Sequence, residues 1–157
     1  MTHQTKYCCA ALLCILCTGL SSCTKKKNPE PFDNDPIAAR TLRYLTQSPW
    51  KETSIEYKTA AGTWIAMPLS ASDLALSYVF KKDGTYTVYK PSNEVNGTGT
   101  WVIIGDNTQL AVNFTTTYNF NILNDTKMQL GLDAQIDYQD GSGAVTVYYG
   151  MRETFVH

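Results

Sequence analysis

From Trp50 to the C-terminus, apolar residues alternate with polar ones in short runs that turn residues separate. This two-residue period is typical of strands with one buried face, because successive side chains of a strand point to opposite faces of a sheet. We count eight such strands in sequential order. The first covers Trp50 to Tyr57, and the last is expected to carry Val145, Val147, Tyr149 and Met151 on one face. The chain is therefore predicted to be an all-β domain.

The connections between these strands are short. Asp83-Gly84 separates two alternating runs, and an Asp-Gly pair supplies the positive φ angles of a two-residue type I′ hairpin turn. Gly105-Asp106-Asn107 and Asn124-Asp125 separate later runs in the same way. Strands that follow one another through short turns form an antiparallel meander.

An eight-stranded meander can close into a barrel, which removes the exposed edges of an open sheet. Such a barrel is filled by side chains or holds one small ligand. A β-sandwich is the alternative architecture.

Before the strands, Asp35-Pro36 predicts a helix start, with an acidic cap and proline at the first helical position. One short helix should follow and end before Pro49, with its apolar side formed by Ile37, Thr41, Tyr44 and Leu45.

Two motifs, taken in this order, carry a family resemblance. The residues from Phe80 to Tyr86 read FKKDGTY, and those from Gly97 to Trp101 read GTGTW. With the short helix, the tryptophan of the first strand, and Arg152 near the end, they resemble the lipocalin-like lipoproteins of Bacteroidetes over residues 36–157. The resemblance implies an eight-stranded barrel. It also implies that Arg152 covers Trp50 and closes one barrel end, which is a structural role.

The segment from Thr59 to Asp73 is the longest connection and contains Trp64 and Met67. In a lipocalin-like barrel this segment covers the open mouth, so both residues are candidate lid residues that contact a ligand. In the alternative, they pack into an extra strand or onto the outside of the barrel. The sequence leaves both interpretations open.

Candidate cavity residues follow from the more apolar face of each strand. They are Leu110, Val112, Phe114, Tyr118, Phe120, Met128, Leu130, Val147 and Tyr149. An aromatic and aliphatic interior with a few tyrosine hydroxyls suits a small apolar or amphipathic ligand. A solid core without any cavity is the alternative.

The N-terminal segment predicts processing and a lipid anchor. The tetrapeptide LSSC ending at Cys23 follows an apolar stretch and resembles a bacterial lipobox, where a signal peptide is cut before the lipid-bearing cysteine. The stretch of eleven residues is shorter than the roughly 20 that span a bilayer. We thus expect a signal peptide at 1–22, a lipidated flexible tether at 23–35, and the barrel domain at 36–157. By resemblance, the periplasmic face of the outer membrane is the expected location, and the membrane is a partner through Cys23.

Charge and residue usage disfavour several function classes. With 13 basic and 14 acidic residues and no basic patch in the domain, nucleic acid is not an expected partner. The two histidines, His3 and His157, lie at the ends of the chain, so the body of the domain lacks the commonest general base. We expect no enzyme, no metal and no cofactor. Two functions remain: a barrel that binds a small ligand, or a filled barrel that docks or inhibits another envelope protein.

Overall fold

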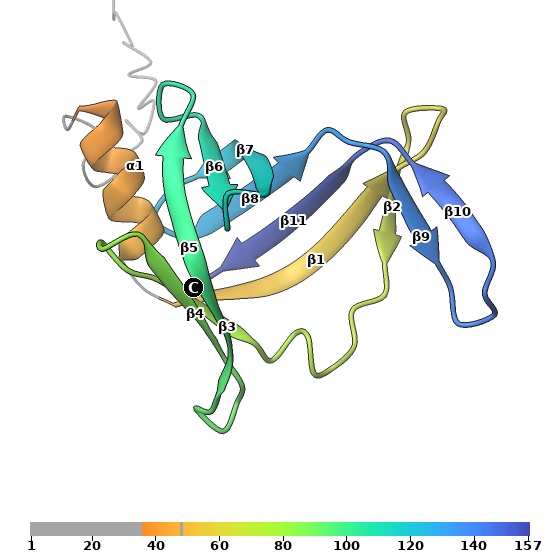
Figure 1. Ribbon diagram of the computed structural model, residues 1–157, viewed down its shortest axis with the longest axis horizontal. Helices are drawn as coiled ribbons and strands as arrows, with labels where there is room; N and C mark the ends of the chain where they lie inside the picture. The colour runs from red at the N-terminus through yellow and green to blue at the C-terminus, as the bar shows by residue number, and fades with distance from the viewer. Residues whose placement is uncertain (1–35, 48) are drawn as a thin grey trace, which may run out of the picture.

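The computed structural model describes residues 36–47 and 49–157. It contains one helix and eleven strands (Figure 1). The helix α1 spans Ile37–Thr46, and the strands are β1 (Trp50–Lys58), β2 (Trp64–Met67), β3 (Ser77–Phe80), β4 (Thr85–Tyr89), β5 (Val95–Ile104), β6 (Gln109–Val112), β7 (Thr116–Leu123), β8 (Lys127–Leu132), β9 (Ile136–Gln139), β10 (Val145–Tyr148) and β11 (Met151–Val156). The helix is too short to cross a membrane, and no other helix occurs in the described part of the chain.

Eight strands form a closed antiparallel barrel. Their order around the barrel is β1-β3-β4-β5-β6-β7-β8-β11, and β11 pairs back with β1. Each strand pair is antiparallel, and six of the eight strands follow one another directly through β3 to β8. The predicted eight-stranded meander, closed into a lipocalin-like barrel with a short N-terminal helix, is confirmed.

The last barrel strand differs from the prediction. The run that begins at Val145 does not enter the barrel: β10 pairs with β9 in a separate two-stranded sheet. Met151–Val156 closes the barrel instead, between β8 and β1. Alternation continues at odd positions through both β10 and β11, so the sequence pattern does not reveal the break at Gly150.

The turn at Asp83-Gly84 also differs in type. Only Gly84 has a positive φ, of 83°, whereas Asp83 does not. Gly84 N–H donates to the Lys81 carbonyl at 3.1 Å, and Lys81 N–H donates to the Thr85 carbonyl at 2.8 Å. This is a type I turn followed by a left-handed glycine, the usual form of a slightly longer hairpin loop. The Asp83 carboxylate accepts hydrogen bonds from Thr85, which fixes the turn.

The helix α1 packs at one end of the barrel, and the β9–β10 hairpin and β2 lie at the other (Figure 1). At the helix end, Leu45 and Trp50 are fully buried, and the Trp50 indole N–H donates to the Leu45 carbonyl at 3.0 Å. At the hairpin end, Tyr148 packs against Tyr57 of β1, with ring centroids 4.9 Å apart. The core is one cluster formed by Leu45, Trp50, Phe80, Trp101, Leu110, Met128, Leu130 and Phe155.

Two glycines of β5 offer a matched test of the barrel wall. A Cβ at Gly99 would overlap the side chains of Asn113 and Tyr86, whereas a Cβ at Gly97 would meet nothing. Since overpacking typically costs about 1–3 kcal/mol, Gly99→Ala is expected to lower the free energy of unfolding by that amount. Gly97→Ala should change it by less than about 0.5 kcal/mol. Urea denaturation of both variants checks the prediction, and equal effects would contradict this packing.

Candidate ligand-binding cavity

The barrel contains a cavity of about 240 Å³ that is partly open to solvent. Its walls come from six of the eight barrel strands, and its lining residues are Tyr78, Phe80, Tyr86, Leu110, Val112, Tyr118, Leu130, Glu153 and Phe155. The volume lies just below the usual range of roughly 300–1,000 Å³ for ligand pockets, so a ligand must be small. The lining is mainly aromatic and aliphatic, with three tyrosine hydroxyls and one carboxyl group.

Four of the candidate cavity residues line this space: Leu110, Val112, Tyr118 and Leu130. Met128 is fully buried in the core cluster, and Phe120 packs against that cluster without reaching the cavity wall. The alternation of β6, β7 and β8 therefore places these side chains on the inner side of the barrel.

Three other candidates lie outside the barrel. Phe114 is 81% exposed, with a φ of 57°, because β6 already ends at Val112 and the chain turns toward β7 there. Val147 belongs to the separate β9–β10 hairpin, and Tyr149 follows it; they are 39% and 51% exposed. The expectation that these three line a cavity is wrong.

Trp64 and Met67 are not lid residues over this cavity. They begin and end β2, which pairs with the second half of β1, with Trp64 opposite Lys58 and Met67 opposite Ile55. Neither side chain lines the cavity. The structure therefore agrees with the alternative interpretation, in which Trp64 and Met67 belong to an extra strand.

The expected pair of Trp50 and Arg152 does not form. Strand register places Arg152 opposite Glu56, at the far end of β1 from Trp50. The Trp50 ring instead stacks on the C-terminal His157, with ring centroids 3.7 Å apart. The Arg152 guanidinium lies 4.5 Å from the centre of the Trp64 ring. His157 therefore covers Trp50, and Arg152 covers Trp64 instead of Trp50, the partner that the resemblance implies.

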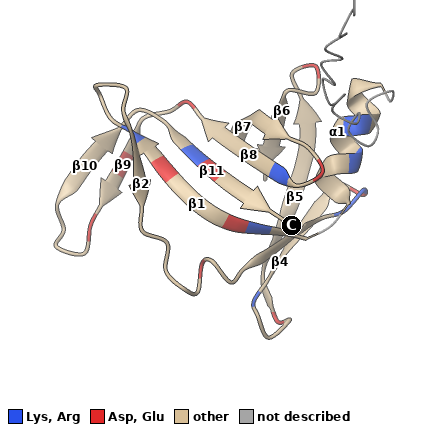
Figure 2. Cartoon of the chain, turned by 180° about the vertical axis from the view of Figure 1, so that it is seen from behind, with Lys and Arg blue, Asp and Glu red and all other residues tan. Residues whose placement is uncertain are grey.

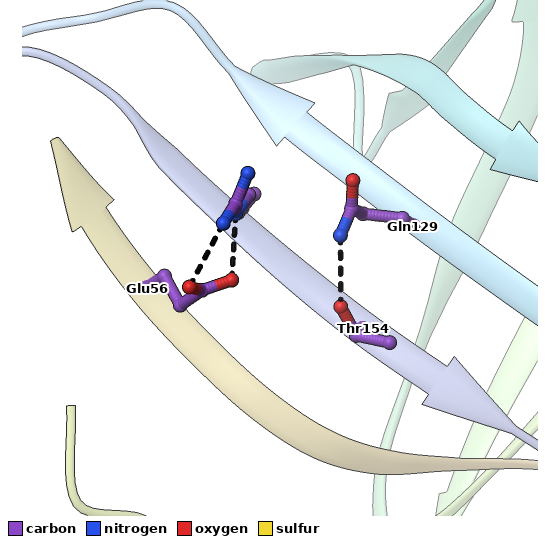
Figure 3. Close-up of polar contacts among 4 residues, drawn as sticks. Glu56, Gln129 and Thr154 are labelled. Atoms are coloured by element: carbon purple, nitrogen blue, oxygen red, sulfur yellow. Dashed lines mark hydrogen bonds and ion pairs between the residues drawn. The ribbon is translucent and has the colours of Figure 1, made fainter. Parts of the chain in front are cut away.

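Arg152 also forms a two-pronged ion pair with Glu56 on the outside of the barrel (Figure 3). Its Nε and Nη2 donate to the two carboxylate oxygens at 2.6 and 2.9 Å. The hydrogen bond from Arg152 lowers the pKa of Glu56. On the same outer face, Gln129 donates to the Thr154 hydroxyl at 3.1 Å (Figure 3). Because Arg152 and Thr154 point outward, the residues that alternate with them, Glu153 and Phe155, point inward.

Two glutamates inside the barrel are the feature that the sequence analysis missed. Glu153 lines the cavity from β11. Glu52 is 6% exposed and lies opposite Phe155, so it shares the inner face with that cavity residue. A bulge at Thr53 then shifts the register, and Glu153 lies opposite Ile55. The two carboxyl groups are therefore diagonal neighbours on the inner surface of adjacent strands.

Neither carboxyl group has a basic partner among residues 36–47 and 49–157. Within the described residues, no ion pair involves Glu52 or Glu153, and Glu52 Oε1 is buried without a hydrogen-bond partner. Acidic and basic residues both occur along β1 and β11 (Figure 2). Burial raises the pKa of Glu153 to about 7. Burial, followed by the charges of Glu153 and Asp73, raises the pKa of Glu52 to about 7.

The pKa values of two cavity tyrosines, Tyr78 and Tyr118, depend on the same surroundings. Burial raises the pKa of Tyr78 and of Tyr118, and the charges of Glu52 and Glu153 raise both further. These hydroxyls therefore stay protonated. No group of three histidine, cysteine, aspartate or glutamate side chains gathers to hold a metal ion in the part of the chain that the structure describes.

The alternation could have located both glutamates. Glu52 is two residues from Trp50, and Glu153 is two residues from Phe155, so each shares a face with a core aromatic residue.

Compared with known proteins, the chain matches no family model. No curated protein matches it at a significant level.

Proposed function

We propose that this protein is a binding module that holds one small amphipathic ligand inside its barrel. The observation that supports this function is the cavity of about 240 Å³ within a closed barrel, with an apolar and aromatic wall. A preformed concave site with few polar groups is the usual form of a small-molecule site. The solid core, which was the alternative, would leave no such space.

The β9–β10 hairpin supports a second candidate function. It projects beyond the barrel (Figure 1), and Val145, Val147 and Tyr149 keep 60%, 39% and 51% of their surface exposed. Apolar groups gathered on a projecting hairpin are typical of a surface that another protein covers. The second candidate is therefore an envelope protein that docks or inhibits a partner through this hairpin.

We also propose that the barrel is attached to a membrane through a lipid on Cys23, with residues 24–35 as a tether. This proposal depends on the lipobox pattern, and Cys23 lies outside the residues that the structure describes. The expected location is the periplasmic face of the outer membrane. A tethered binding module would hold its ligand close to the envelope surface.

A cavity-filling variant tests the proposed ligand site. Val112 lines the cavity, whereas Val102 is 39% exposed on the outside of the neighbouring strand β5. Phenylalanine at position 112 adds volume to the space that a ligand would occupy. We expect Val112→Phe to weaken binding of the neutral fluorophore 2-naphthol at least 10-fold, measured by fluorescence titration. Val102→Phe is the control and should bind like the unchanged protein.

Equal binding by both variants would show that the fluorophore binds outside the barrel, and would favour the hairpin surface. If 2-naphthol fails to bind the unchanged protein at all, a cavity open to small aromatic ligands is contradicted. Thermal denaturation of both variants checks that each remains folded.

A further inference from the structure

We propose that the ligand of this cavity is a small organic cation, an amine whose ammonium group lies between the carboxylates of Glu52 and Glu153 and whose apolar part contacts the tyrosine rings. This inference rests on the proposed function, because it names the chemical class of ligand for the same cavity. It is supported by the placement of the two carboxyl groups, an unpaired acceptor, and the aromatic wall.

The placement of the carboxyl groups provides the first argument. Glu153 lines the cavity, and Glu52 lies on the same inner face of the adjacent strand, opposite the cavity residue Phe155. Diagonal neighbours on antiparallel strands lie roughly 7–8 Å apart at their Cα atoms, which flexible glutamate side chains can bridge around one group. Glu52 is not among the residues that line the cavity, so we place the ammonium against Glu153, with the Glu52 carboxyl reaching it from the adjacent strand.

The unpaired acceptor provides the second argument. Glu52 is 6% exposed, and its Oε1 has no hydrogen-bond partner. A buried polar atom without a partner is unfavourable, so native proteins nearly always supply one. An ammonium group has three N–H donors and a positive charge, and it would satisfy this oxygen together with Glu153. A neutral alcohol has a single donor and leaves the negative charges uncompensated.

The aromatic wall provides the third argument. Tyr78, Tyr86 and Tyr118 line the cavity along with Phe80 and Phe155, and the Tyr78 and Phe155 rings meet edge to face at 5.3 Å. Aromatic faces attract cations, an effect that increases when water is removed. The carboxyl groups of β1 and β11, together with the aromatic rings of the wall, therefore favour a cation with an apolar body.

The charges around the site disfavour other ligand classes. The nearby charged groups that act on Glu52 are Glu153 and Asp73, and both are acidic. An anion such as a fatty-acid carboxylate would be repelled at this end of the cavity. A metal ion held by protein alone is also disfavoured, because no third ligating side chain joins the two glutamates within the described residues.

Matched probes test the inference. 2-Phenylethylamine and 2-phenylethanol have the same ring and chain length and differ in the charged group, and 3-phenylpropionate carries the opposite charge. At pH 7.5 we expect the amine to bind at least 10-fold more tightly than the alcohol, and the carboxylate to bind more weakly than both, measured by calorimetric titration.

Glutamine variants assign this preference to the two carboxyl groups. Glu52→Gln and Glu153→Gln should each reduce the preference for the amine over the alcohol to less than 3-fold, while binding of 2-naphthol persists. Glu56→Gln is the matched control, because Glu56 lies on the same strand but on the outer face. It should leave the preference unchanged.

The outcomes separate the two proposals. If 2-naphthol binds but the amine and the alcohol bind equally, the inference of a cationic ligand is wrong and the binding module stands. If the preference persists in both glutamine variants, Glu52 and Glu153 do not hold the amine. If neither 2-naphthol nor any of the three probes binds, both proposals fail.

Discussion

Replacing Trp50 with alanine is expected to lower the free energy of unfolding by about 3–5 kcal/mol, the range for removing a large buried aromatic residue. Trp50 is fully buried at the end of the barrel that α1 and His157 cover. Its loss would leave a cavity between the helix and the first strand, and it would remove the hydrogen bond to the Leu45 carbonyl. Urea denaturation followed by circular dichroism measures the change.

Trp64 provides the control for this prediction. It lies on the extra strand β2, half-buried under Arg152, and is absent from the core cluster. Trp64→Ala should cost about 1 kcal/mol, because it removes a surface cation–π contact and little buried area. If Trp64→Ala destabilises the protein as much as Trp50→Ala, a core cluster that includes Trp50 and leaves out Trp64 is incorrect.

Replacing both inner glutamates with glutamine is expected to stabilise the empty barrel by about 2–4 kcal/mol at pH 8. The pKa of each carboxyl is about 7 in the folded protein and 4.5 ordinarily. Between these values, the unfolded chain releases protons that the folded chain retains, so stability falls as the pH rises from 4.5 to 7. Above pH 7 the loss is complete. One fully effective shift corresponds to about 3 kcal/mol, and residual solvent exposure and mutual interaction reduce the sum.

Thermal denaturation between pH 4 and pH 8 measures this effect. The double variant Glu52→Gln/Glu153→Gln should denature at a higher temperature than the unchanged protein at pH 8, with a much smaller difference at pH 4. Glu56→Gln should lack this stabilisation, because the pKa of Glu56 is lowered by Arg152 rather than raised. A double variant that is less stable at pH 8 than the unchanged protein would contradict unpaired, buried carboxyl groups.

Together these predictions describe a barrel that its core residue Trp50 stabilises and that the carboxyl groups of Glu52 and Glu153 destabilise when no ligand is bound. The carboxyl groups destabilise the ligand-free state at neutral pH, and a bound cation would compensate them. Ligand binding to the folded state adds stability according to ligand concentration and affinity. A binding role accounts for two unpaired glutamates that a purely structural barrel would not require.

Alternation and short turns were sufficient to predict the barrel, because each strand needs one apolar face and each short turn places consecutive strands side by side. Local pattern could not identify which run closes the barrel. Val145 to Tyr148 and Met151 to Val156 alternate in phase, and only pairing with β8 and β1 distinguishes them. Pairing over a long sequence separation is decided by tertiary packing, which a local pattern does not contain.

The sequence predicted only part of the candidate site, again because a local pattern does not contain all the information that positions its residues. Leu110, Val112, Tyr118 and Leu130 follow from apolar alternation and line the cavity. Glu153 and Glu52 share their faces with core aromatics, but an apolar alternation does not identify charged side chains that point inward. The partner of Arg152 depends on strand register, which the bulge at Thr53 shifts by one residue. A bulge leaves no reliable mark in a polar stretch of strand.

The measurement that tests the central claim most directly locates a bound ligand by NMR. With 2-naphthol bound, nuclear Overhauser effects between its ring protons and protein methyl groups identify the residues in contact. We predict contacts to the methyl groups of Leu110, Val112 and Leu130, which line the cavity. Contacts to Val145 and Val147 of the exposed hairpin, with none to the three inner residues, would contradict a ligand site inside the barrel.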